Sequence, residues 1–174
     1  MKKILKIMSV ALIALIFAAG EGHAQKNKAD KNTFAWRYEI EPYKAVGAQG
    51  LNLIKVWSYY KKADIAIEQA KKNAVHGIIF RGFGAMNGVR GQRPLAGSNS
   101  NLEEEKKEFF KEFFADGGKY MKFVNITNDG SISPKDRLKV GKEYKIGVVV
   151  SVNVDLLRKD LEDAGVIQRL SDRF

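Results

Sequence analysis

The chain has 174 residues, with 30 Lys and Arg against 20 Asp and Glu, so its formal net charge at pH 7 is +10. It contains no cysteine, which excludes a disulfide framework and the common cysteine-containing zinc sites. The basic balance favours acidic partners such as anionic lipid, acidic envelope polymers or nucleic acid. The charges are nevertheless spread along the chain, as they also are in a soluble basic protein without such a partner.

Residues 1–24 have the pattern of a cleaved secretory signal peptide. Lysines precede an apolar run at 7–19, and small residues at 22 and 24 allow cleavage after Ala24. The run has about 13 apolar residues, whereas a membrane-spanning helix needs roughly 20, so cleavage is favoured over an uncleaved anchor. Because no cysteine lies at the cleavage site, the product is not expected to be a lipoprotein. We predict a periplasmic or secreted protein with no nucleic-acid partner, beginning with a disordered polar tail at 25–32.

The pattern from 34 to 80 predicts a hairpin followed by a helix. Residues 34–41 alternate between apolar and polar, Pro42 marks the strand's end or an edge position, and residues 51–60 form a second strand after a short connection. Asp64 is expected to cap a helix that packs on this hairpin. The apolar positions of the helix are Ile67, Ala70, Ala74 and Ile78, and its solvent side is expected to carry Glu68, Lys71, Lys72 and Asn73.

Residues 81–101 are rich in glycine and arginine and predict a long loop. Loops of this length are usually functional or disordered, so the segment is either a flexible crossover or a loop that binds a partner or an anion. Its glycines do not have the spacing of phosphate-binding loops. The candidate binding residues within it are Arg81, Arg90 and Arg93.

A phenylalanine-rich helix is expected after this loop. Ser100 and Glu103 have the spacing of a capping box, and Gly117 and Gly118 provide a stop. The phenylalanines either close over the sheet or offer a surface to a partner, for which Phe109 and Phe113 are the candidates. Two possible chemical groups are interpreted as non-catalytic: the Glu103, Glu104 and Glu105 run as solvated charge, and His76 as structural.

The last part of the chain predicts two more strands and a helix. Residues 120–127 alternate as a third strand, a turn is expected at 128–130, and residues 131–143 form a polar connection. Residues 144–154 alternate strictly, so a strand places Val150 and its apolar neighbours on one face. Asp155 is expected to cap a final helix that ends before Gly165.

These elements predict one α+β domain over residues 33–174. We expect a mostly antiparallel sheet of about four strands with helices on one face, in the order strand, strand, helix, loop, helix, strand, strand, helix. The hairpin with the following ADIAIEQAKKNA segment, and the valine-rich strand with residues 156–165, resemble the small α+β domain of bacterial envelope lipoproteins and of the flagellar H-ring protein's N-terminal region. In that group an alanine-rich helix packs on the sheet, and Ala66, Ala70 and Ala74 match it.

Three functions remain open on these observations. The resemblance implies an envelope structural or interaction role and carries over no catalytic residue, which favours a non-enzymatic exported module that binds an envelope protein or assembly. The alternative is a binder of an acidic polymer or an anionic membrane surface through the basic loop. The third is a periplasmic hydrolase with Asp or Glu as the working groups. No cofactor is predicted.

Overall fold

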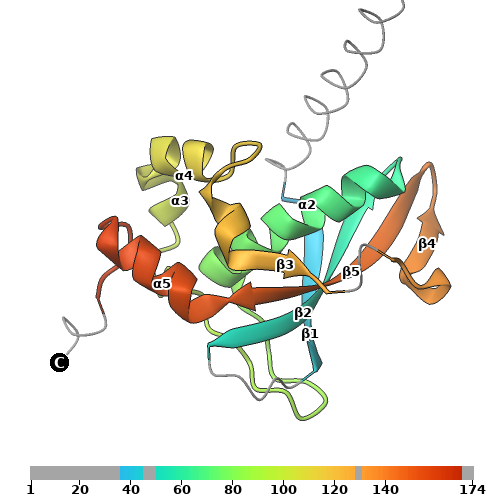
Figure 1. Cartoon of the computed structure of the whole chain (residues 1–174), viewed down its shortest axis with the longest axis horizontal. Coiled ribbons are helices and arrows are strands. Elements are labelled where there is room, and N and C mark those ends of the chain that lie inside the picture. The colour runs from blue at the N-terminus through green and yellow to red at the C-terminus, as the bar shows by residue number, and fades with distance from the viewer. Residues whose placement is uncertain (1–35, 45–49, 128–130, 170–174) are drawn as a thin grey trace, which may run out of the picture. The chain divides into compact units, whose positions relative to one another are not determined.

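Five antiparallel strands form one sheet in the computed structural model, which describes residues 36–44, 50–127 and 131–169 (Figure 1). The order is β1-β2-β5-β3, and β4 also pairs with β5. The predicted α+β class is confirmed, with one strand more than the four expected. The strands are β1 (Tyr38–Lys44), β2 (Leu51–Tyr60), β3 (Val124–Ile126), β4 (Arg137–Val140) and β5 (Glu143–Asn153).

The longest strand, β5, is the centre of the sheet, and the alternation of 144–154 predicted it to within one residue. It pairs with β2 along almost its whole length, with Val150 opposite Ile54 and Val148 opposite Val56. These four side chains are buried on one face. On its other edge β5 pairs with β3 near its end and with β4 near its beginning.

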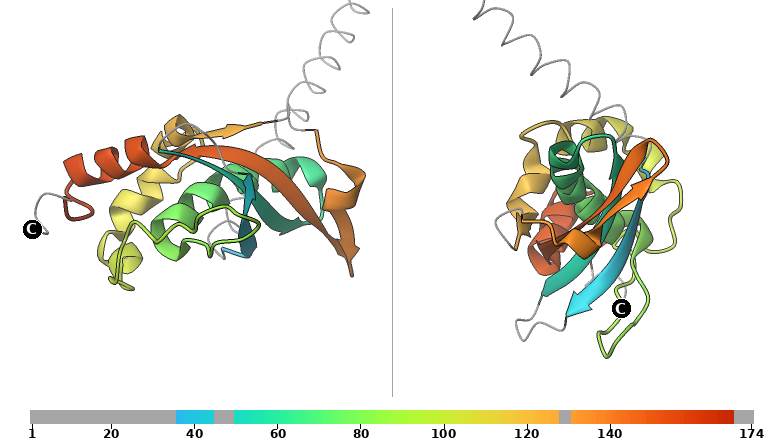
Figure 2. Two further views of the ribbon diagram at one scale, coloured as in Figure 1. Left: turned by 90° about the horizontal axis from the view of Figure 1, so that it is seen from below. Right: turned by 90° about the vertical axis from the view of Figure 1, so that its right-hand side faces the viewer.

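The helix α2 (Ala63–His76) packs on β2 and β5 and continues into a π-helical turn, Gly77–Arg81 (Figure 2). Ala66, Ala70 and Ala74 are fully buried, so the helix lies close to the sheet. Lys72 and Asn73 were expected on the solvent side, and this is wrong. Asn73 donates to the Ser58 hydroxyl at 2.9 Å, and Lys72 reaches the Asp116 carboxylate at 2.8 Å. The helix is therefore covered on more than one side.

For two of the three helix caps that the sequence predicted, the helix begins earlier than the predicted cap residue. α2 begins after Lys62, which makes no side-chain cap, and Asp64 lies within the first turn. α5 (Val154–Asp163) is capped by Asn153, whose side-chain oxygen accepts from the Leu156 backbone N–H at 3.0 Å, while Asp155 is already helical. In both places the backbone turns into the helix before it reaches the expected residue. Gly165 has the positive φ, +64°, that the sequence predicted just past this helix.

The third predicted cap, the capping box of Ser100 and Glu103, does not form. The expected phenylalanine helix is divided at Lys106 into two short helices, α3 (Leu102–Glu105) and α4 (Lys107–Phe113). The N-cap residue of α3 is Asn101, and its side chain makes no capping hydrogen bond. Glu103 extends to His76 instead. Within the preceding loop, Phe83 pairs with Gln92 and Met86 with Val89, so residues 83–92 form a small hairpin.

The expected strand at 120–127 begins as a 3-10 helix, Lys119–Phe123, so only β3 is extended. The expected connection at 131–143 contains a 3-10 turn, Pro134–Asp136, and β4, which the sequence analysis missed. The expected signal peptide, the 25–32 tail, the first residues of the 34–41 strand and the 128–130 turn lie outside the described residues. Within the described parts of the chain, every helix is too short or too polar to cross a bilayer.

Candidate binding face of the sheet

The sheet face opposite α2 carries a row of alternating cations and aromatic rings. Strand periodicity places Lys55, Trp57 and Tyr59 of β2 on this face, since they alternate with Ile54, Val56 and Ser58, which are fully buried on the other face. β1 adds Tyr43, and β5 adds Lys145, which is the direct partner of Tyr59 in the sheet. Three strands therefore build one surface.

Each ring in this row has two cations within about 5.6 Å of its centre. The Lys55 ammonium nitrogen lies 5.4 Å from the Tyr43 ring centre and 5.3 Å from that of Trp57, and the Lys145 nitrogen lies 5.2 Å from Trp57 and 5.6 Å from Tyr59. These are cation–π distances. The complete series, which we call the aromatic–cation row, is Lys44, Tyr43, Lys55, Trp57, Lys145, Tyr59 and Arg37.

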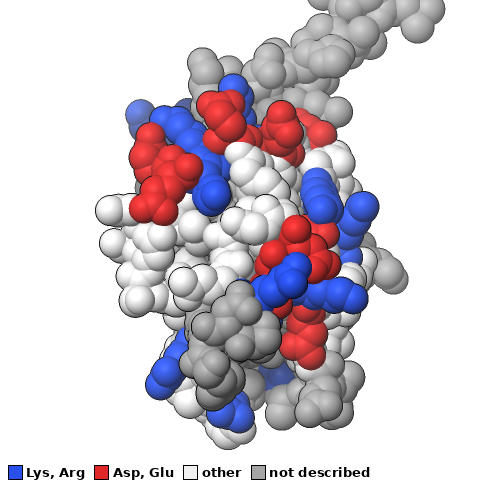
Figure 3. Space-filling view, turned by 90° about the vertical axis from the view of Figure 1, so that its left-hand side faces the viewer, with Lys and Arg blue, Asp and Glu red and all other residues white. Residues whose placement is uncertain are grey.

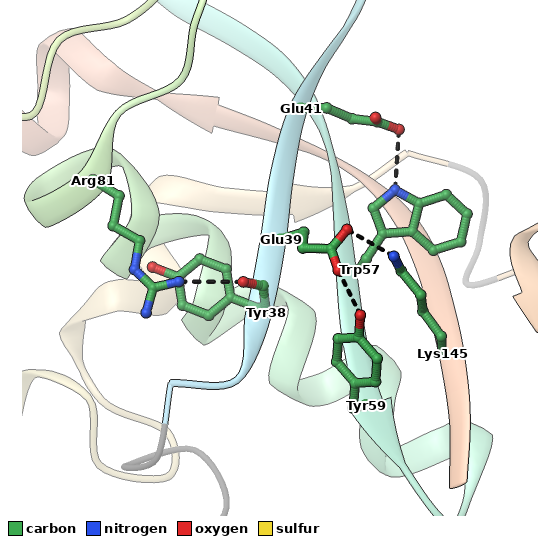
Figure 4. Close-up of polar contacts among 7 residues, drawn as sticks. All are labelled: Tyr38, Glu39, Glu41, Trp57, Tyr59, Arg81 and Lys145. Atoms are coloured by element: carbon green, nitrogen blue, oxygen red, sulfur yellow. Dashed lines mark hydrogen bonds and ion pairs between the residues drawn. The ribbon is translucent and has the colours of Figure 1, made fainter. Parts of the chain in front are cut away.

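Carboxylates hold the polar groups of the row in place (Figure 4). Glu39 accepts from the Tyr59 hydroxyl and lies 2.7 Å from the Lys145 nitrogen, and Glu41 accepts from the Trp57 indole N–H at 3.0 Å. The hydrogen bond from Lys145 lowers the pKa of Glu39, and the same bond raises the pKa of Lys145. Both groups are therefore charged throughout the neutral pH range.

Glycine 147 lets the Trp57 indole lie flat on the sheet. A Cβ placed on Gly147 would meet three consecutive atoms of the six-membered ring, Cε3, Cζ3 and Cη2, at 3.0, 2.9 and 3.0 Å. Such nearly equal distances require the ring to stack face-on, because an edge-on ring would bring its middle atom much closer than the other two. One face of the indole thus covers the backbone of β5, and the opposite face points away from the sheet.

The three candidate arginines have different environments. Arg81 lies over the Tyr38 ring, 4.1 Å from its centre, and donates to the Tyr38 carbonyl at 3.2 Å (Figure 4). Arg90 is exposed in the small hairpin. Arg93 is exposed and lines a cavity of about 460 Å³ that Arg158 also lines. Arg81 is therefore held by β1, and Arg93 is the one that faces a cavity.

The candidate phenylalanines are mostly internal. Phe113 is 2% exposed and stacks on Phe123 with ring centres 6.0 Å apart, so it is not available to a partner in this conformation. Phe109 is half-buried and stacks on Phe113 at 5.6 Å. The phenylalanines of α4 thus close over the core, which was one of the two expected arrangements, and Phe113 is buried rather than offered as a surface contact.

His76 is buried, 2% exposed, between β1 and α3. Its Nε2 lies 3.3 Å from a Glu103 oxygen, and its Nδ1 lies 2.6 Å from the Tyr38 hydroxyl. Because a carboxylate only accepts, Nε2 carries the proton of the neutral ring, and Nδ1 then accepts from the Tyr38 hydroxyl. Burial lowers the pKa of His76 and outweighs the opposing effect of Glu103, while Arg81 lowers it further. Burial also raises the pKa of Tyr38. His76 therefore connects α2 to both neighbours in its neutral form.

We expect this histidine to make the protein less stable in acid. The unfolded chain takes up a proton near the ordinary histidine pKa of about 6.5, whereas folded His76 takes one up only at lower pH. Stability is therefore full above about pH 6.5 and falls below it, by at most about 1.4 kcal/mol per pH unit from this group. Urea unfolding between pH 7.5 and 5 measures the difference in unfolding free energy between the wild type and His76→Gln. A difference that does not change with pH would contradict this expectation.

Of the predicted carboxylate run, Glu103 contacts His76, and Glu104 pairs with Lys107 on the surface at 3.0 Å. Among residues 36–44, 50–127 and 131–169, no three His, Asp or Glu side chains are grouped so that they could share a metal ion. The sequence analysis missed the aromatic–cation row. Its signal was the two-residue spacing of Lys55, Trp57 and Tyr59.

Comparison of the chain with protein-family models, with curated proteins and with solved structures finds no match. The resemblance to envelope lipoprotein and H-ring domains stays a prediction.

Proposed function

We propose that the protein is a non-enzymatic binding module of the bacterial cell envelope, exported by a cleaved signal peptide, and that it binds through the aromatic–cation row. The observation that carries the proposal is the row itself. Tyr43 is 38% exposed and Trp57 and Tyr59 are half-buried, so the aromatic surface is accessible to a ligand. Aromatic side chains held by neighbouring groups contribute most strongly to binding because they lose little conformational freedom.

The non-enzymatic part of the proposal rests on the roles of the polar groups. Glu39 and Glu41 each hold an aromatic side chain, through the Tyr59 hydroxyl and the Trp57 indole N–H. The lowered pKa of Glu39 suits an ion-pair partner and is the opposite of what a general acid needs at neutral pH. These carboxylates therefore support the rings and do not have the properties of a hydrolase pair.

The test is co-sedimentation of the exported form of the chain with a washed bacterial envelope fraction. Tyr59→Ala and Trp57→Ala are each expected to weaken binding about fivefold or more, as the loss of an aromatic contact at a binding centre does. Tyr144→Ala, which removes a half-buried ring from the opposite face of β5, is the matched control and is expected to bind as the wild type does. Equal binding by all variants, or a turnover reaction that Glu39→Gln abolishes in a folded chain, would refute the proposal.

One observation favours the acidic-polymer alternative. Arg93 and Arg158 line the same cavity, which brings two guanidinium groups toward one space. However, the face of the molecule shown in Figure 3 carries Lys and Arg beside Asp and Glu around an uncharged area, so it does not present a field of one sign. If this alternative holds, Arg90→Ala with Arg93→Ala will weaken binding of a polyanion and flatten its salt dependence. The same pair of changes leaves binding through the row unaffected.

A further inference from the structure

The charges around the aromatic–cation row cancel. The row contains four cations, and the carboxylates that contact its members are Glu39, Glu41, Asp136 and Glu143, which are also four. Three of the cations lie in ion pairs, at 2.7 Å for Lys145 with Glu39, 2.8 Å for Lys55 with Asp136 and 3.1 Å for Arg37 with Glu143. A strongly charged polymer would gain little from such a surface, because three of its four cations are already paired with a carboxylate.

The density of charge also distinguishes this face from the centre of a protein interface. Interface centres are depleted of charged residues, and burying an ion pair under another protein costs several kcal/mol per ion unless its geometry is excellent. Here a cation lies between each pair of neighbouring rings, so no two rings form a continuous apolar area. A ligand that fits must combine an apolar surface with many hydrogen-bonding groups at short intervals.

We propose that the ligand of this face is an uncharged saccharide chain. This inference specifies the ligand of the binding module proposed above and rests on that proposed function. A sugar ring has a face of C–H groups, which stacks on an aromatic ring, and a rim of hydroxyls, which donate to carboxylates and accept from ammonium groups. The Trp57 indole, flat over Gly147, provides the stacking surface, and Tyr59 lies two residues farther along the strand, roughly 7 Å away. The two rings can thus contact separate sugar units of one chain.

The carboxylates keep capacity for a ligand. A carboxylate has about four lone-pair sites, and Glu41 uses one of them for the Trp57 N–H, while Glu39 uses its oxygens for Tyr59 and Lys145. The side chain of Glu39 is 56% exposed and that of Lys145 is 20% exposed. Sugar hydroxyls can therefore reach both members of this pair without breaking it.

Fluorescence titration tests the saccharide directly. Trp36→Phe leaves Trp57 as the single tryptophan, because the chain has two. The probes are three uncharged tetrasaccharides, chitotetraose, cellotetraose and maltotetraose, with polyglutamate as the anionic comparison. We expect a saturable change of Trp57 emission with at least one tetrasaccharide, and a Kd that changes less than about twofold between roughly 50 and 500 mM NaCl.

Two variants locate the contact. Tyr59→Ala is expected to raise the Kd about fivefold, as the loss of one stacked ring does. Gly147→Ala is expected to displace the indole and abolish the response while a thermal melt still shows a folded chain, because the new methyl occupies the space under the ring. Tyr144→Ala, which removes a half-buried ring from the opposite face of β5, is the control and is expected to leave the Kd unchanged.

The outcomes separate this inference from the proposed function. If no tetrasaccharide changes the Trp57 emission but envelope binding still depends on Trp57 and Tyr59, the saccharide proposal is refuted. The protein is then a binding module whose partner is a protein. A response to polyglutamate alone that disappears with salt would overturn it in favour of an acidic polymer. If envelope binding itself does not depend on the row, both proposals fail.

Discussion

Replacing Val150 with Asp is expected to prevent the chain from folding. Val150 is 0% exposed at the centre of β5, opposite Ile54 of β2 and Ile126 of β3. A carboxylate there is desolvated among aliphatic side chains, at a cost of several kcal/mol, against a total stability of roughly 5–15 kcal/mol for a domain of this size. Circular dichroism during urea unfolding measures the loss of the folded state.

The neighbouring residue provides the control. Val149 points to the opposite face of β5 and is half-buried, so Val149→Asp leaves its charge in contact with water. We expect its effect to be much smaller, within about 1 kcal/mol, as for other surface substitutions. Equal loss of stability in the two variants would show that β5 does not separate a buried face from an accessible one.

The second large effect is expected at the ion pair between Lys55 and Asp136. Both residues are 8% exposed, and their charged groups lie 2.8 Å apart. Asp136→Ala leaves the Lys55 ammonium without its carboxylate in a mostly buried position, which costs roughly 3 kcal/mol or more. The midpoint of urea unfolding is expected to fall accordingly.

Two comparisons separate burial from pairing. Lys55→Met combined with Asp136→Leu removes both charges and is expected to recover much of the stability, because neither group remains unpaired. Glu104→Ala breaks an exposed pair with Lys107 and is expected to leave the midpoint of urea unfolding almost unchanged. A loss as large as that of Asp136→Ala would mean that burial does not govern these pairs.

The sequence predicted the two central strands well because the apolar residues of β5 recur with a period of two, and because β2 is rich in apolar and aromatic residues along its whole length. β4 was missed since its four residues are all exposed and so carry no burial pattern. Lys72 and Asn73 were predicted to face solvent because the periodicity of apolar residues in a helix identifies only one buried face. α2 has a second covered side, where Lys72 reaches Asp116.

The binding face could be predicted only in part. The period of β2 places Lys55, Trp57 and Tyr59 together, but their neighbours on β1 and β5 depend on strand register. That register brings Gly147 opposite Trp57 and Lys145 opposite Tyr59, residues about ninety positions apart in the chain. No local pattern in the sequence contains this pairing.

The edges of the sheet determine how a partner can approach it. β1 is one edge, and it contains Pro42, which has no N–H to donate, followed by an irregularity in the register before Lys44. The other edge of β5 is shared by two short strands of three and four residues, and β4 carries Arg137 and Lys139. Interrupted edges of this kind, one of them with a basic strand, resist the addition of an extended strand, whether from a peptide or from a second copy of the chain. A ligand that lies across the strands, on the rings, meets none of these obstacles.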